Sequence, residues 1–186
     1  MNSISALENI FKKGLFGDYE NKKENKIIKL SESKNLFICQ VVKYKISNVD
    51  EKKLKIDELN LPDSLKTTFN NETRIIWMGP SNWLVVSKKL DLMKFISTLF
   101  DDNNFAITDL SHSRTIIEIE GDLADEVIKK GCPLNINELR EGDCANSTFH
   151  GVTITIDFLS NEPKKIRLFA LRSFGESLYH SVSDAC

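Results

Sequence analysis

The chain has 186 residues, of which 41% are hydrophobic and 28% are charged, and its formal net charge is -2. This balance is typical of a soluble globular protein, and it gives no electrostatic attraction to nucleic acid or to an anionic membrane. The sequence contains no apolar run near the roughly 20 residues of a membrane-spanning helix, and its N-terminus lacks the apolar core of a signal peptide. We therefore expect a cytoplasmic protein that binds neither nucleic acid nor membrane.

Residues 1–35 are expected to form a short helix followed by a polar segment. Ser5 begins a capping-box pattern, and three apolar side chains then share one helical face: Leu7, Ile10 and Phe11. A helix this short is marginal alone, so it must dock on this chain or on a partner. Residues 18–34 are polar and mixed in charge, which favours a solvated loop interrupted by a short strand at 27–30. Alternatively, its lysines form a basic contact patch for an acidic partner: Lys22, Lys23, Lys26 and Lys29.

The next part of the chain predicts a strand, a hairpin and a helix. Residues 36–46 are rich in β-branched and aromatic side chains, which indicates a strand. Residues 48–71 are poorly patterned, and loops of such length usually have a function or contact something. Gly79-Pro80-Ser81-Asn82 joins two apolar runs within 74–86, so we predict a hairpin there. A helix ending near Asp101 follows, with an apolar face formed by Leu92, Phe95, Ile96 and Leu99.

Residues 107–136 predict a strand, a helix and a defined stop. Thr115, Ile117 and Ile119 alternate with Ile116, Glu118 and Glu120, which predicts a half-buried strand. Gly121 ends this strand, and the carboxylate of Asp122 is suited to cap the next helix. That helix has an apolar stripe and carries cations in its last turn. Gly131 could adopt the left-handed conformation of a C-cap before Pro133 forbids continuation. The residues of the stripe and the last turn are Leu123, Ala124, Val127, Ile128, Lys129 and Lys130.

The C-terminal part predicts two turns, three strands and a helix. His150-Gly151 and Asn161-Glu162-Pro163-Lys164 are turn sequences between β-patterned runs. Ser173 begins a second capping box, followed by a helix whose inward face is formed by Phe174, Leu178 and Val182. The order of elements indicates an α+β fold of duplicated, mostly antiparallel sheets with packed helices. We expect a single domain over 36–186, made of two similar halves, 36–104 and 105–186.

Asp109, Ser111 and His112 are the obvious candidates for an acid, a nucleophile and a base. A working triad is assembled from distant segments, so three groups this close in sequence cannot easily align. We expect a turn in which Asp109 or Ser111 accepts backbone hydrogen bonds and His112 lies at the surface or at a subunit boundary.

The four cysteines include no C-x-x-C pair, and we expect reduced, partly buried thiols. They are Cys39, Cys132, Cys144 and Cys186. A zinc site could be drawn from Cys132, Cys144 and His150, but the spacing fits no usual ligand pattern. Cys132 follows a helix C-terminus, whose negative dipole disfavours a thiolate nucleophile.

Two arginines and two tryptophans complete the candidates. Arg114 and Arg172 could clamp a carboxylate, such as a folate glutamate tail, or end strands at the surface and pair with a neighbouring acid. Trp77 and Trp83 flank the hairpin and are expected in the core, with a base-stacking or pterin platform as the alternative. No G-x-G-x-x-G or Walker sequence is present. We therefore assign no catalytic, cofactor-binding or metal-ligating residue to this chain.

Three pieces of the sequence, in the same order, resemble the gamma subunit of bacterial heterotetrameric sarcosine oxidase. They are DLSHSRT with the following KGCPL, WMGPSNWLVV from Trp77, and LRSFGESLYHSVSDA from Leu171. That family is related to the folate-binding aminomethyltransferase (glycine-cleavage T protein) superfamily, and the resemblance runs from about Arg74 to the C-terminus. It departs at Tyr179, where the family commonly has Trp.

The resemblance implies a non-catalytic subunit of a flavoenzyme that demethylates sarcosine to glycine and passes the one-carbon unit to tetrahydrofolate. It implies that FAD, FMN, NAD and tetrahydrofolate are held by other subunits, and that the partners are larger alpha and beta subunits, chiefly alpha, and a small delta subunit. The alternatives are a stand-alone tetrahydrofolate-binding protein of the aminomethyltransferase type, which generally carries a further C-terminal domain, and a subunit of a related N-methyl amino acid dehydrogenase.

Overall fold

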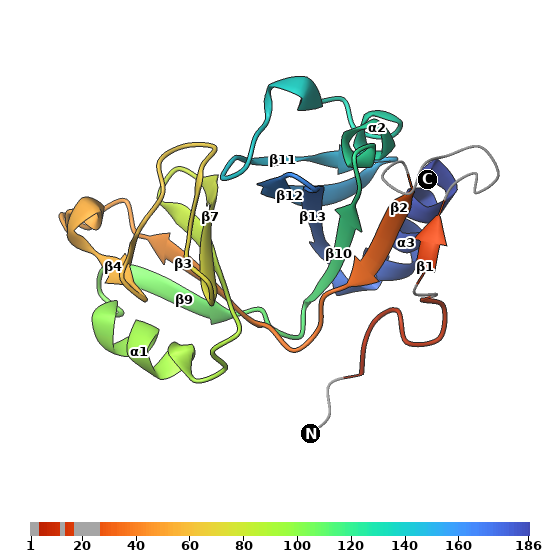
Figure 1. The fold of residues 1–186 in the computed structure, drawn as a ribbon. Helices are drawn as coiled ribbons and strands as arrows, with labels where there is room; N and C mark the ends of the chain where they lie inside the picture. The colour runs from red at the N-terminus through yellow and green to blue at the C-terminus, as the bar shows by residue number, and fades with distance from the viewer. Residues whose placement is uncertain (1–3, 12–13, 17–26) are drawn as a thin grey trace. The chain divides into compact units, whose positions relative to one another are not determined.

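The structure is a computed structural model that describes residues 4–11, 14–16 and 27–186. The chain forms two compact units (Figure 1). We call Asn35–His112 the central unit, and Met1–Lys34 together with Ser113–Cys186 the terminal unit. Each is built on its own antiparallel sheet, and the described helices are few and short. The sequence placed the division between 104 and 105, whereas β9 (Phe105–Asp109) pairs with β3 (Phe37–Lys43) and therefore belongs to the central unit.

The central unit has a five-stranded sheet of order β6-β7-β8-β3-β9. The predicted hairpin is confirmed, because β7 (Thr73–Gly79) and β8 (Asn82–Ser87) pair directly across the Pro80-Ser81 turn. The poorly patterned segment 48–71 contains a 3-10 turn and three short strands: η2 (Glu51–Lys53), β4 (Lys55–Ile56), β5 (Leu59–Asn60) and β6 (Thr67–Phe69).

The predicted helix of the central unit is α1 (Leu92–Leu99). It packs on the core through Leu92 and Ile96, while Phe95, which was predicted on the apolar face, is 49% exposed. Leu92 and Ile96 lie one turn apart on the same side of the helix, and Phe95 lies beside that line at the edge of the buried stripe.

The terminal unit has a six-stranded sheet of order β1-β2-β10-β13-β12-β11. Its strands are β1 (Gly14–Phe16), β2 (Ile28–Glu32), β10 (Arg114–Glu120), β11 (Cys144–Phe149), β12 (Val152–Asn161) and β13 (Lys164–Leu171). Its helical elements are α2 (Ala124–Lys129), η3 (Ile136–Glu138), η4 (Arg172–Phe174) and α3 (Gly175–Ala185). The strand predicted at 27–30 and both predicted C-terminal turns are confirmed.

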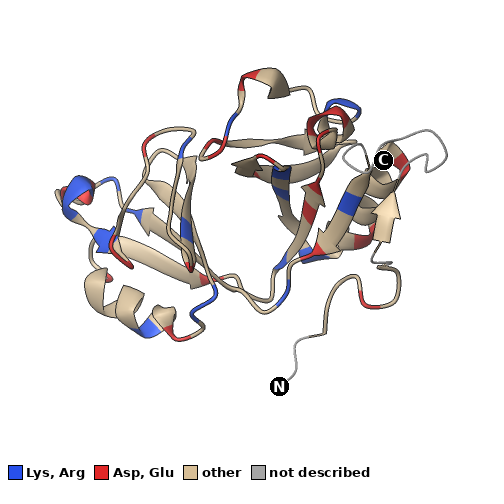
Figure 2. Cartoon of the chain, in the orientation of Figure 1, with Lys and Arg blue, Asp and Glu red and all other residues tan. Residues whose placement is uncertain are grey.

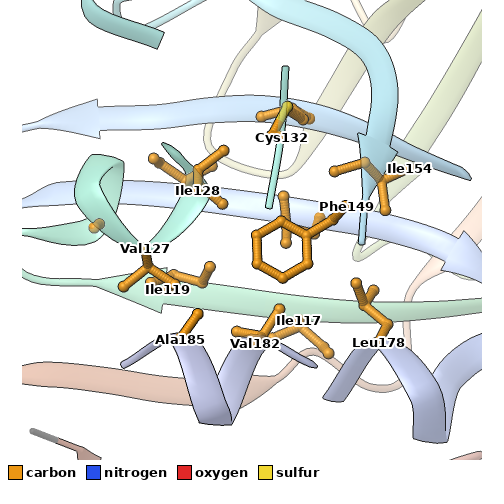
Figure 3. Close-up of a cluster of buried hydrophobic side chains, with 14 of the residues drawn as sticks. Ile117, Ile119, Val127, Ile128, Cys132, Phe149, Ile154, Leu178, Val182 and Ala185 are labelled. Atoms are coloured by element: carbon orange, nitrogen blue, oxygen red, sulfur yellow. The ribbon is translucent and has the colours of Figure 1, made fainter. Parts of the chain in front are cut away.

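The core of the terminal unit lies between one face of this sheet and its helices (Figure 3). Ile117 and Ile119 of β10 face α2 and α3, and Phe149 lies near the centre of the cluster. The inward residues of α2 and α3 are fully or almost fully buried: Val127, Ile128, Leu178, Val182 and Ala185. At about 25 cal/mol per Å² of apolar surface, this burial is the main stabilising contribution to the unit.

Strand β10 was predicted to be half-buried, and that prediction is wrong. Ile116 and Glu118, on the face opposite Ile117, are only 3% and 7% exposed. β10 is an inner strand, hydrogen-bonded to β2 and β13, so cross-strand side chains cover its second face as well.

Both predicted caps of α2 are also wrong. The helix begins at Ala124 with Leu123 at the N-cap and no side-chain cap bond, so Asp122 does not cap it. Gly131 has no positive φ. It is required instead because a Cβ there would meet Phe149 and His150 at 2.6–2.9 Å, and its carbonyl accepts the His150 N–H at 3.0 Å.

The capping box predicted at Ser173 is absent: Phe174 is the N-cap of α3, without a side-chain bond, and it is 48% exposed rather than inward. The inward positions of Leu178 and Val182 are confirmed.

Residues 4–11, where the sequence predicts a short N-terminal helix, form a single turn instead, and Ser5 Oγ accepts the Leu7 N–H at 2.9 Å. The segment does dock on this chain, since Leu7 is fully buried in the terminal core.

Three of the lysines proposed as a basic patch lie outside the described residues: Lys22, Lys23 and Lys26. Within the part of the chain that the structure describes, no helix has the length and hydrophobicity needed to cross a membrane.

Candidate functional site

The loop between β9 and β10 holds the three residues that resemble a catalytic triad. The Ser111 N–H donates to Asp109 Oδ1 at 2.9 Å, and Ser111 Oγ accepts the Ile38 N–H at 3.0 Å. These bonds form the turn that the sequence predicted. The Ser111 N–H, and then its hydroxyl, hold the pKa of Asp109 below its usual value. Ser111 Oγ is thus used to tie the loop to β3, and His112 is exposed.

The cysteines are free, and three of the four are buried. Burial, and then the negative charge of Asp109, raise the pKa of the Cys39 thiol to about 12. Cys132 Sγ donates to Ser147 Oγ at 3.3 Å. No group of three or more His, Cys, Asp or Glu residues able to hold a metal occurs in the described ranges, so Cys132, Cys144 and His150 are not brought together.

The two tryptophans face each other across the β7–β8 hairpin. Trp83 is 2% exposed and its indole N–H donates to the Pro62 carbonyl at 3.3 Å, which confirms the predicted core position. Trp77 is partly buried and packs against the same core. This arrangement uses Trp83 for packing and leaves it unable to serve as a stacking platform.

Arg114 and Arg172 lie at the ends of neighbouring strands. Arg172 Nη2 donates to the Ile4 carbonyl, and Arg114 Nη1 lies 3.5 Å from the Ser113 carbonyl. Burial lowers the pKa of the Arg114 guanidinium. Both arginines are partly buried where a strand begins or ends, and neither forms an ion pair within the described part of the chain, so the predicted pairing with an acid is not observed.

A buried ionic cluster between β10 and β13 was not predicted from the sequence. Figure 2 shows acidic residues on β10 and basic residues on the neighbouring β13. Glu118 accepts from Arg167 Nη2 at 2.6 Å, from Ser33 Oγ at 2.6 Å, and pairs with Lys165 Nζ at 2.8 Å. Glu118 is the cross-strand partner of Arg167 in β13, and Ser33 directly follows β2, the other neighbour of β10. The cluster therefore joins three separate segments, and no local pattern in the sequence could reveal it. The cluster is fully paired, which is the arrangement expected of a structural ion cluster.

The terminal unit also has a cavity of about 590 Å³ between α2, η3 and the β12–β13 turn. Ile136 and Phe158 form an apolar part of its wall. Its charged residues are already engaged: Lys164 pairs with Asp125 at 2.8 Å, and Arg140 donates to the carbonyls of Asn137 and Leu139 at 2.5 and 2.8 Å.

The chain was compared with family models, with curated proteins and with solved structures. No family model matches the chain. Over 114 residues, 61% of this chain, it is 24% identical to the sarcosine oxidase subunit gamma of Corynebacterium sp. strain U-96 and 27% identical to that of strain P-1. The match spans 56% of each relative, so the chain covers about half the length of these curated proteins.

Two solved structures have a similar fold. A chain of the heterotetrameric sarcosine oxidase from Corynebacterium sp. U-96, in complex with pyrrole 2-carboxylate, matches with a TM-score of 0.78 and 18% identity, over 88% of this chain and 85% of that chain. The glycine cleavage system aminomethyltransferase T from Bartonella henselae matches with a TM-score of 0.57 and 13% identity, over 82% of this chain and 44% of that chain. The resemblance and the fold class predicted from the sequence are thus confirmed: the chain is similar in sequence to sarcosine oxidase gamma subunits, and it has the α+β, mostly antiparallel fold found in heterotetrameric sarcosine oxidase and in aminomethyltransferase T.

Proposed function

We propose that this chain is the gamma-type subunit of a heterotetrameric oxidase of the sarcosine oxidase type. The observation that carries the proposal is the agreement between sequence and fold. Both curated relatives are sarcosine oxidase gamma subunits, and the structural match with a TM-score of 0.78 covers most of both chains. The complex would demethylate sarcosine to glycine in the cytoplasm, transfer the one-carbon unit to tetrahydrofolate and pass electrons to oxygen.

In this proposal the chain is structural and the chemistry belongs to its partners. The larger alpha and beta subunits, with a small delta subunit, hold FAD, FMN, NAD and tetrahydrofolate, and the chain packs chiefly against alpha. Its own polar candidates support this division of labour because they are committed to the fold. Ser111 ties a loop to Ile38, Glu118 is enclosed by cations, and the Cys39 thiol is buried.

Assembly tests the proposal directly. The full chain is co-expressed with the larger subunits of the sarcosine oxidase-type complex from the same source, and the products are separated by size-exclusion chromatography. Co-elution of the chain with flavin absorbance is the expected result. Elution of the chain alone, with a complete flavin-containing complex formed without it, contradicts the proposal.

The fold of aminomethyltransferase T favours one other candidate, a stand-alone tetrahydrofolate-binding protein. Isothermal titration of the purified chain with tetrahydrofolate distinguishes the two. Micromolar binding supports the stand-alone protein. Absence of binding, together with assembly into the flavin-containing complex, supports the gamma-type subunit or the equivalent subunit of an N-methyl amino acid dehydrogenase. To distinguish those two, the rate at which the assembled complex oxidises sarcosine is compared with its rate for other N-methyl amino acids.

A further inference from the structure

Apolar side chains of the terminal unit are exposed where β13 ends and α3 begins. Ile4 is 67% exposed, Phe174 is 48% exposed and Leu171 is 47% exposed. Together with the two arginines described above, these residues form what we call the η4 surface: Ile4, Arg114, Leu171, Arg172 and Phe174. Exposed apolar side chains gathered in one place mark contact sites more often than single ones do.

The backbone fixes the positions of these side chains. Leu171 is the N-cap of the single 3-10 turn η4 and Phe174 is its last residue, so one turn of chain separates the two side chains. A Cβ on Gly175 would lie 3.1 Å from the Ala6 Cβ, so the N-terminal segment is held closely against the start of α3. The bond from Arg172 to the Ile4 carbonyl then ties Ile4 to η4. Little ordering is therefore left to be lost on binding, which favours affinity.

The charge of the η4 surface is positive. Arg114 is the cross-strand neighbour of Leu171, and Arg172 follows Leu171 directly. Both guanidiniums bond only to backbone carbonyls among the described residues, so two cations lack a carboxylate partner there. Arginine and aromatic side chains are enriched in the cores of protein interfaces, whereas lysine is depleted. A carboxylate can satisfy a guanidinium by two parallel hydrogen bonds.

We propose that the η4 surface is a docking site for an acidic, partly apolar segment of a larger subunit. Phe174 and Leu171 pack against apolar side chains of that segment, and its carboxylates accept hydrogen bonds from Arg114 and Arg172. This inference rests on the proposed function and names the surface through which it is carried out.

Two other occupants fit the surface less well. An anionic membrane would gain about 1 kcal/mol for each of only two arginines, against a chain whose net charge is -2. A free polyglutamate tail could use both arginines, but it would leave Ile4, Leu171 and Phe174 exposed.

The test compares matched variants of the full chain for binding to the larger subunits, with the dissociation constant measured by biolayer interferometry at low and high salt. Phe174→Ala and Phe95→Ala remove side chains of nearly equal exposure, 48% and 49%, from different units. Arg114→Gln combined with Arg172→Gln removes both charges, and Arg140→Gln serves as its exposed control. Circular dichroism of every variant establishes that folding is retained.

We expect Phe174→Ala to weaken binding about tenfold or more, and Phe95→Ala to change it less than about twofold. The double arginine variant should weaken binding by a similar factor and reduce its salt dependence, while Arg140→Gln should do neither. If the wild-type chain binds and the η4 variants bind equally well, this inference is wrong while the proposed function stands. If the wild-type chain does not bind the larger subunits, the proposed function fails.

The other occupants give separate results. Sedimentation of the wild-type chain with phosphatidylserine vesicles, lost in the η4 variants while assembly is unchanged, would overturn the choice of a protein partner. Binding of polyglutamate that depends on the two arginines, again without an effect on assembly, would do so as well.

Discussion

Replacing Glu118 with glutamine should destabilise the terminal unit and change how its stability depends on pH. Glu118 is 7% exposed. Burial by itself would raise its pKa, but the charge of Arg167 and hydrogen bonds from Lys165, Ser33 and Arg167 outweigh burial and lower the pKa from 4.5 to about 2. The carboxylate is therefore more stable in the folded chain than in the unfolded one.

The size of the effect follows from this change. Each tenfold difference in proton affinity corresponds to about 1.4 kcal/mol, so the carboxylate contributes about 3 kcal/mol to the free energy of unfolding at pH 7. Because the pKa is lowered on folding, this contribution is fully present above about pH 5 and is lost as the pH falls towards 2. Glu118→Gln leaves Arg167 and Lys165 without their counter-charge, so we expect a loss of about 3 kcal/mol at pH 7 and almost none near pH 2.

The measurement must report on the terminal unit alone. Both tryptophans of the chain, Trp77 and Trp83, lie in the central unit, so their fluorescence follows that unit. Hydrogen exchange of the backbone amides in β10 and β13 reports the unfolding free energy of the terminal unit. It is measured at increasing urea concentrations and at several pH values between 2 and 7. Glu176→Gln is the control, because the Glu176 side chain is 68% exposed and lies 3.8 Å from His180, so its loss should change stability by less than about 0.5 kcal/mol. The reasoning is refuted if Glu118→Gln lowers the free energy of unfolding by less than about 1 kcal/mol at pH 7. It is also refuted if the difference in unfolding free energy between the wild-type chain and this variant does not shrink in acid.

Three further substitutions or treatments follow from the packing. The Thr115 hydroxyl is buried and has no hydrogen-bond partner among the residues that the structure describes, so Thr115→Val should be neutral or stabilise by up to about 1 kcal/mol in urea unfolding. A loss above about 1 kcal/mol would show that the hydroxyl is used. Gly131→Ala places a methyl group against Phe149 and His150, and we expect a cost of about 1–3 kcal/mol in the same assay, with unchanged stability as the contrary result. Cys39 is fully buried and its pKa is raised to about 12, so its thiol should resist a disulfide reagent at pH 8 until the chain is unfolded, which peptide mapping after labelling can detect.

The sequence predicted those parts of the fold whose cause is local. Turn residues such as His150-Gly151 and Gly79-Pro80 set their hairpins because few other residues accept the backbone conformations required, and His150 and Ser81 do have positive φ. The buried faces of α2 and α3 follow from helical spacing alone. The turn at Asp109 and Ser111 was predicted because a short D-L-S-H cannot align as a triad.

Features that depend on distant parts of the chain could not be predicted. The second face of β10 is buried because β10 lies between β2 and β13, and the Glu118 cluster exists only in that register. Gly131 looked like a helix cap, but it is required by the approach of the β11–β12 turn. Asp122 and Ser173 are residue types that favour caps, but neither is a cap, because each helix begins one residue later than the polar side chain suggests.

The central claim is that this chain contributes shape and contacts to an oxidase while other subunits carry the chemistry. The most direct test is to assay the purified full chain alone for sarcosine-dependent formation of formaldehyde, and then to repeat the assay after the larger subunits are added. We predict no formaldehyde from the isolated chain and turnover only in the assembled complex. Formaldehyde production by the isolated chain would contradict the account.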